Sequence, residues 1–246
     1  MEHKKIIPSE KNTRILPESM NLITTSGNLI ITHSSSLKEQ TLDAIIDYVF
    51  LRYEKIRFFF ETPPVKIHIY IFPHQSLFHL FYLGREGEDW LVGATGNGLV
   101  QIIDPNAVTN NGQTFETMQK VVVHEIVHYF TFLRGYTKKR YMSEGIAAYL
   151  SEQHDERYIG VIKKKLPYID GIAEQLFKGN TDEGKFAELG GYALAYTIID
   201  YMLQCYGEEA LKKYFISEYS HPFGLLKIDF DVFINDWKQY LRQIYS

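Results

Sequence analysis

The stretch from Val121 to His128 constrains this chain more than any other. It reads VVVHEIVH, which is His-Glu-x-x-His inside an apolar run. On a helix, four residues advance about 6 Å and about 400°, so His124 and His128 lie one turn apart on one face. Two imidazoles in that arrangement can bind one zinc ion, and Glu125, about 100° around the helix, can reach a water on the metal. The stretch therefore predicts a hydrolase with Zn2+ as its cofactor.

Composition narrows the class of protein. The chain has 246 residues, of which 45% are hydrophobic, enough for one large domain or two lobes that share a cleft. A net charge of −4 without a basic stripe predicts no nucleic-acid partner. The single cysteine, Cys205, excludes an internal disulfide and a cysteine-based zinc site.

Hydropathy predicts no membrane association. No run of about 18 apolar residues occurs, so we expect no membrane span. The N-terminus lacks the long apolar core of a signal peptide. We therefore expect a soluble cytoplasmic protein, with export by a signal-independent route left open.

The patterning changes from mixed to helical along the chain. VKIHIYIF at 65–72 alternates as a strand does, with His68 on the face opposite the isoleucines. Gly27-Asn28 predicts a hairpin turn, and the capping-box pattern that starts at Ser36 predicts a helix that ends before Pro63. Further strands are expected at 90–95 and 99–103, and helices at 74–83, 114–134, 141–150, 156–166, 168–178, 189–206, 208–218 and 229–245.

The helix that carries the motif is expected to pack by its back. Its apolar residues cluster on the side away from the histidines, at Phe115, Val122, Ile126, Tyr129 and Leu133. The alternative is a helix with two surface histidines and a surface glutamate. However, this helix is apolar around nearly its whole circumference, and burying these polar groups without partners is costly. The pattern therefore favours histidines turned toward a cleft that holds a metal.

A catalytic zinc ion takes three protein ligands and keeps one position for water. The pattern His-x-x-x-His-x-x-Gly-x-x-His would supply a third histidine. It is excluded, because Thr131 and Arg134 stand at its glycine and its third histidine. Glu144 is the favoured third ligand, since it follows the motif helix at a distance that allows a loop and a return helix. Glu152 and Asp155 are rivals that lie further along the chain.

Small residues follow the predicted third ligand. Gly145, Ala147 and Ala148 would let the second helix approach the motif helix closely.

These two motifs together resemble a known family. His124-Glu125-Ile126-Val127-His128, followed by Ser143-Glu144-Gly145-Ile146-Ala147-Ala148-Tyr149, is similar to the gluzincin metallopeptidases, the thermolysin-like and M1-aminopeptidase-like group, and within it to the compact peptidase MA-like proteins. There the second motif commonly reads Asn-Glu-Gly-x-Ala-x-Tyr, so Ser143 is a departure. The resemblance covers residues 65–217, although its specific motifs are short.

The resemblance implies a fold with two lobes. It implies an α+β, zincin-like architecture with an N-terminal α/β lobe that holds a small mixed sheet, a central HExxH helix and a mostly helical C-terminal lobe. The expected division is an N-terminal arm at 1–20, an α/β lobe at 21–135 that includes the active-site helix, and a helical lobe at 136–246. Together these form one catalytic domain.

The resemblance also implies a donor for the oxyanion. In M1-like relatives a tyrosine at the start of a later helix donates to it, and Tyr192 matches that place. Tyr196, one turn on, is the alternative, and either tyrosine could serve packing alone. His221 is a rival, because thermolysin-like members use histidine, although Pro222 places it in a loop.

Two departures from the family limit what it implies. Gly93-Ala94-Thr95-Gly96-Asn97 resembles the Gly-Ala-Met-Glu-Asn edge strand of M1 aminopeptidases, whose Glu binds the free amino terminus of the substrate. Gly96 stands in place of that Glu, which favours an endopeptidase; an ordinary glycine-rich hairpin is the alternative. Ala148 stands where thermolysin-like relatives have a carboxylate that orients a histidine, so the second shell is unassigned.

The sequence thus predicts a zinc-dependent peptide-bond hydrolase of the gluzincin type, acting on a peptide or protein substrate. Its metal ligands would be His124, His128 and Glu144, with Glu125 as general base and Tyr192 as oxyanion donor. The alternative is a catalytically silent gluzincin-fold module that binds a peptide or protein. The sequence predicts neither the cleavage specificity nor the oligomeric state.

Overall fold

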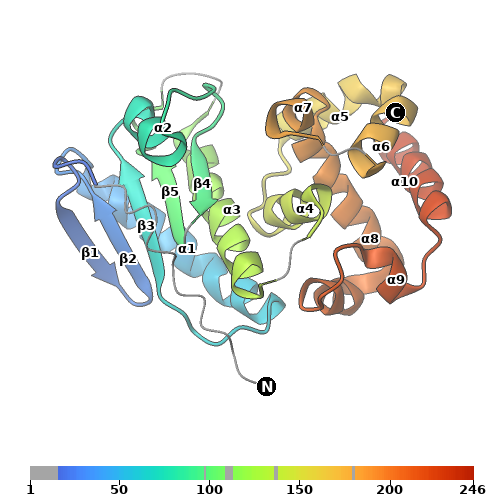
Figure 1. Cartoon of the computed structure of the whole chain (residues 1–246), viewed down its shortest axis with the longest axis horizontal. Coiled ribbons are helices and arrows are strands. Elements are labelled where there is room, and N and C mark those ends of the chain that lie inside the picture. Colours follow the sequence, from blue (N-terminus) through green and yellow to red (C-terminus); the bar gives the residue numbers. More distant parts are fainter. Residues whose placement is uncertain (1–15, 97, 109–112, 136–137, 179–180) are drawn as a thin grey trace. The chain divides into compact units, whose positions relative to one another are not determined.

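One mixed sheet organises the N-terminal half of the chain (Figure 1). The computed structural model describes residues 16–96, 98–108, 113–135, 138–178 and 181–246. The sheet order is β1-β2-β3-β5-β4, with the central pairs β2–β3 and β3–β5 parallel and the two outer pairs antiparallel. The strands are β1 (Leu22–Ser26), β2 (Leu29–His33), β3 (Ile67–Phe72), β4 (Gly93–Gly96) and β5 (Leu99–Ile103).

Strand chemistry explains how this sheet forms. Gly27 has φ 53° and joins β1 to β2, which confirms the predicted hairpin at this position. In β3, Ile67, Ile69 and Ile71 are buried whereas His68 is exposed, as the alternation predicts. His68 is therefore a surface residue of the sheet.

Three helices accompany the strands: α1 (Glu39–Phe59), α2 (Gln75–Leu83) and α3 (Phe115–Leu133). α2 lies on one side of the sheet, and α1 and α3 on the other (Figure 1). Phe78 of α2 packs on Phe72 of β3 with ring centroids 5.9 Å apart. On the opposite side, the Gln119 amide of α3 donates to the Ala44 carbonyl of α1 at 2.7 Å.

The beginning of the described chain joins this core. Met20 is 4% exposed and lies in the hydrophobic cluster that contains Phe72 and Phe78. The expected N-terminal arm thus ends in a buried residue, Met20, and its first 15 residues lie outside the described part of the chain.

The chain divides into two compact units. The first comprises residues 1–51 and 63–129, and the second comprises residues 52–62 and 130–246. α1 and α3 each begin in the first unit and end in the second. The unit boundary therefore falls within the motif helix, directly after Tyr129, the residue that follows His128.

The second unit is helical. Besides the ends of α1 and α3 it contains α4 (Arg140–Leu150), α5 (Glu156–Lys165), a 3-10 turn (Leu166–Tyr168), α6 (Ile169–Lys178), α7 (Glu183–Glu188), α8 (Gly191–Phe215), α9 (Pro222–Leu226) and α10 (Phe230–Tyr245). α8 is central: Trp237 of α10 donates its indole N–H to the buried Thr197 hydroxyl of α8 at 3.1 Å. Gly207, at φ 78° and ψ 167°, kinks α8 where two separate helices are predicted.

The α+β class, the small mixed sheet and the mainly helical C-terminal half agree with prediction. Three expectations about the number and bounds of the helices are wrong. The first helix begins at Glu39, because the Ser36 hydroxyl lies 2.9 Å from the Ser34 hydroxyl instead of starting the helix. The short helices α7 and α9 were not predicted, because five or six residues are too few for an apolar period to be recognised.

Among the described residues, no helix has the length and apolar character needed to cross a membrane.

Candidate metal and catalytic site

His124 and His128 stand on one face of α3, as the spacing predicts. Their Nε2 atoms are 3.0 Å apart, and their ring planes cross at 76°. His124 is 7% exposed and His128 is partly buried. Two ring nitrogens therefore converge on one point at the surface of a mostly buried helix.

The helix around these histidines is buried on several sides. Val122, Val123, Ile126 and Val127 are all 0% exposed. Tyr129 is also buried, and its hydroxyl donates to the Lys66 carbonyl at 3.1 Å. The middle of α3 is thus held by its apolar residues.

The predicted apolar back is wrong at both ends of the helix. Phe115 is 37% exposed and Leu133 is 39% exposed. They occupy the first and last positions of α3, whereas the residues that pack lie in its middle turns.

Glu125 is 7% exposed and lies against the edge strand β4. The Thr95 hydroxyl is 2.6 Å from the Glu125 backbone oxygen and 2.9 Å from its Oε2, with Thr95 as donor to both. A Cβ added at Gly93 would lie 2.7 Å from Val121 Cγ1 and 3.2 Å from Glu125 Cγ. Gly93 therefore allows β4 to pass close to the carboxylate.

The Gly93–Gly96 segment is an edge strand, as the family resemblance implies. β4 ends the sheet order and pairs with β5, with Thr95 opposite Val100 and Gly93 opposite Ile102. Asn97, the last residue of the compared segment, lies outside the described residues.

Glu144 belongs to the second unit, in the second turn of α4, where it is partly buried. Burial raises the pKa of the Tyr158 phenol above its ordinary value, and the negative charge of Glu144 raises it further. Tyr158 donates its hydroxyl to Gln153 Oε1 at 3.0 Å. The charge of Glu144 in α4 thus acts on the phenol of Tyr158 in α5.

The small residue after Glu144 packs on α8. A Cβ added at Gly145 would lie 2.4 Å from the Ala195 carbonyl oxygen and 2.7 Å from Ile199 Cγ1. At Gly145 the expected close approach to the motif helix is therefore wrong: the neighbour is α8. Ala148, at the position of the family carboxylate, is fully buried.

The three predicted oxyanion donors all lie in the second unit. Tyr192 is the second residue of α8, is partly buried and directs its ring edge onto Phe186 with centroids 5.1 Å apart. Tyr196 stacks flat on His154, with centroids 4.3 Å apart and planes 1° from parallel. Each of these two tyrosine rings therefore packs on an aromatic neighbour.

His221 directly precedes a helix. Pro222 is the first residue of α9, a position where proline is favoured, and His221 itself lies in the loop before that helix, as predicted. Burial lowers the pKa of His221, and the nearby charge of Lys139 lowers it further. Its Nδ1 lies 3.4 Å from the Tyr141 hydroxyl.

The structure separates the predicted site residues into two sets. His124, Glu125 and His128 are in the first unit with β4, and Glu144, Tyr192, Tyr196 and His221 are in the second. Thr95 was not predicted as a contact of Glu125. The signal was a hydroxyl residue between the glycines of a predicted edge strand.

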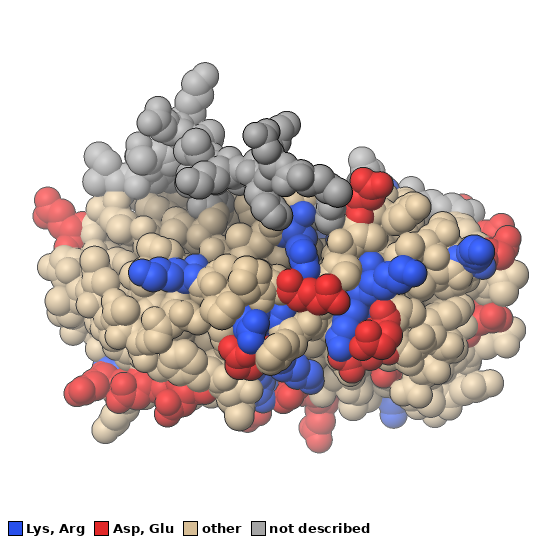
Figure 2. Space-filling model, turned by 90° about the horizontal axis from the view of Figure 1, so that it is seen from below, with Lys and Arg blue, Asp and Glu red and all other residues tan. Residues whose placement is uncertain are grey.

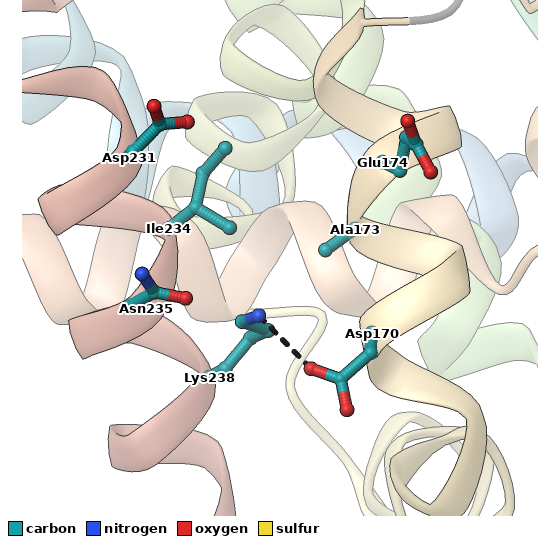
Figure 3. Close-up of a pocket in the computed structure, with 7 residues that line it drawn as sticks. All are labelled: Asp170, Ala173, Glu174, Asp231, Ile234, Asn235 and Lys238. Carbon is teal, nitrogen blue, oxygen red and sulfur yellow. Dashed lines mark ion pairs between the residues drawn. The ribbon is translucent and has the colours of Figure 1, made fainter.

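A pocket elsewhere in the helical unit contains none of these residues (Figure 3). It lies between α6 and α10 and has a volume of about 310 Å³. Asp170, 70% exposed, pairs with Lys238 at 2.9 Å and with Arg242 at 3.0 Å. On the face that Figure 2 shows, acidic and basic side chains lie among one another. The pocket is an open polar groove whose lysine is already paired.

Comparison with known proteins adds no family assignment. No protein-family model matches the chain, and no curated protein matches it.

Proposed function

We propose that this chain is a metal-dependent peptidase of the gluzincin type, in which His124, His128 and Glu144 bind one divalent ion. One observation carries the proposal: two histidine Nε2 atoms 3.0 Å apart stand beside a buried carboxylate, Glu125, on one helix. Burying that polar set is costly unless each group has a function or a partner. The zincin-like fold with two lobes is part of the same proposal.

The ligand set fits zinc. Two nitrogen ligands about 2.0–2.1 Å from a tetrahedral zinc ion are about 3.3 Å apart, close to the distance between His124 Nε2 and His128 Nε2. Among the described residues, His124, His128 and Glu144 are a group that could hold a metal ion. Two imidazoles and one carboxylate are a ligand set of catalytic zinc sites, which also keep a position for water.

Each side chain has a defined task in the proposed reaction. Bound zinc would supply a Lewis acid that makes a water acidic and polarises the scissile carbonyl. Glu125 takes a proton from that water while the water oxygen forms its bond to the carbonyl carbon. Glu125 then gives the proton to the amide nitrogen as the carbon–nitrogen bond breaks. Tyr192 donates its hydroxyl proton in a hydrogen bond to the carbonyl oxygen as negative charge develops there.

The edge strand β4 is the proposed place for an extended substrate. Peptides commonly add to exposed sheet edges through backbone hydrogen bonds, and β4 is the edge that adjoins Glu125. Gly96 offers no carboxylate for a free amino terminus, which supports cleavage within a chain.

A digest tests this proposal. Purified protein is incubated with zinc and an unfolded protein, and the products are followed by mass spectrometry. We expect internal cleavage that a zinc chelator stops and that is lost in Glu125→Gln with zinc still bound. Tyr192→Phe should lower kcat by about a hundredfold, whereas Tyr196→Phe should not. Stoichiometric zinc without cleavage of any substrate would contradict the proposal and favour a binding module.

A further inference from the structure

We propose that Thr95 is a positioning residue for Glu125: its hydroxyl fixes the carboxylate so that Oε1 stays free to accept a proton. This inference rests on the proposed function, because it assigns Glu125 the role of base. Thr95 has no counterpart among the residues that the two motifs supply. It is reached only through the fold, 30 positions before the residue it contacts.

Strand register directs Thr95 at α3. Residues directly opposite each other in an antiparallel pair point to the same face, and Thr95 lies opposite Val100. Val100 is 0% exposed, and the Thr95 hydroxyl contacts Glu125, so α3 covers this face of the sheet. Gly93, two residues earlier, is on the same face and brings the strand close to Glu125. The hydroxyl thus comes from a rigid paired strand.

The two oxygens of the Glu125 carboxylate have different roles in this proposal. Thr95 Oγ1 lies 2.9 Å from Oε2 of Glu125, within normal hydrogen-bonding distance. A donor on Oε2 fixes the rotation of the carboxylate and leaves Oε1 to accept a proton. Hydrogen bonds to a charged group are stronger than neutral ones, so this single bond can hold a buried carboxylate in place.

A purely structural role is the competing explanation. The same hydroxyl lies 2.6 Å from the Glu125 backbone oxygen, and its one proton could serve only to join β4 to α3. The two explanations predict different effects of Thr95→Val on stability once the Glu125 side chain has been removed. They also differ in whether the hydroxyl affects kcat.

The kinetic test uses the full zinc-loaded chain and a fluorogenic peptide taken from a site that the wild type cleaves. Thr95→Val keeps the shape but removes the donor, and we expect kcat to fall about tenfold while KM and zinc content stay within about twofold. Thr95→Ser keeps the donor and should stay within about threefold of the wild-type kcat. Thr25→Val makes the same change on the exposed face of the opposite edge strand and is the matched control.

Equal kcat in Thr95→Val and wild type would overturn the inference. So would a rise in KM with unchanged kcat, or an equal loss of kcat in Thr95→Ser and Thr95→Val. Absence of cleavage by the wild type would instead contradict the proposed function, and a second measurement then decides the inference by itself.

That measurement is a double-mutant cycle on unfolding in urea, which needs no activity. Thr95→Val should raise the equilibrium constant for unfolding about tenfold when Glu125 is present, and less than about threefold in the Glu125→Ala background. The same increase in both backgrounds would show that only the backbone oxygen matters. That result would overturn the inference whatever the protein cleaves.

Discussion

Gly93 is the residue of β4 at which an added side chain would meet the proposed base. A methyl group there would lie 2.7 Å from Val121 Cγ1, 3.2 Å from Glu125 Cγ and 3.4 Å from Glu125 Oε1. Neither neighbour can move freely, because Glu125 is buried and Val121 packs against a buried hydrophobic cluster. The geometry of Glu125 therefore depends on the absence of a side chain one strand away.

Replacing this glycine should damage both stability and activity. Gly93→Ala must push β4 away from α3, which we expect to cost about 1–3 kcal/mol of unfolding free energy and to break the hydrogen bond from Thr95 to Glu125. Urea unfolding and kcat measure the two effects.

The matched control is on the same strand. At Gly96 an added Cβ would meet only Tyr82 Cε2, at an ordinary 3.6 Å. Gly96→Ala should therefore change the unfolding free energy by less than about 0.5 kcal/mol. A loss at Gly96 as large as at Gly93 would mean that glycine in this strand matters for flexibility rather than for close approach.

Single residues also show where sequence reasoning ends. The positions of His124, Glu125 and His128 on one helix follow from their spacing, because helical geometry is local. The hydrogen bond from Thr95 to Glu125 depends on which strand is at the edge and which face it presents. That information exists only after the sheet has formed, so no local pattern could predict it.

Among the described elements of the helical unit, α4 and α8 share the most extensive contact. Gly145 lets the α4 backbone approach Ala195 and Ile199 of α8. The same helix carries Glu144, one residue earlier. The packing of α4 on α8 therefore sets where the proposed third ligand is held.

Gly145→Ala should separate these two helices. The added methyl would overlap the Ala195 carbonyl oxygen, and a backbone atom cannot rotate away, so we expect about 2–3 kcal/mol of destabilisation. Thermal or urea unfolding would measure the loss.

Gly160→Ala gives the opposite expectation. Gly160 is an exposed residue of α5, and a Cβ there meets nothing within 4 Å. Alanine should stabilise the helix by about 0.5–1 kcal/mol. If both substitutions shifted stability in the same direction, close packing at Gly145 would not be the reason for its glycine.

Element prediction succeeded where the apolar period is long. β3, α3 and α4 lie within two residues of their expected bounds, because each has a clear period, and β3 and α3 also end at a proline or a glycine. The neighbour of Gly145 was assigned wrongly, because a small residue predicts close approach but not the element that approaches.

At the scale of the whole molecule, the change from mixed to helical patterning predicted the two kinds of unit. Each unit has its own core: apolar side chains around the mixed sheet in the first, and helices around α8 in the second. The proposed metal site takes two ligands from the first unit and one from the second. A test of this proposed site must therefore measure whether all three residues contribute to binding one metal ion.

The most direct test of the central claim is the amount of zinc bound per chain after dialysis, measured by elemental analysis. We expect about one ion per wild-type chain, and affinities at least about a hundredfold weaker in His128→Ala and Glu144→Gln. Glu152→Gln is the matched control, because Glu152 was a rival ligand and pairs with Arg52 at 2.6 Å. It should bind zinc as the wild type does. A wild type that binds no zinc, or a Glu144→Gln variant that binds it as tightly as the wild type, would contradict the account.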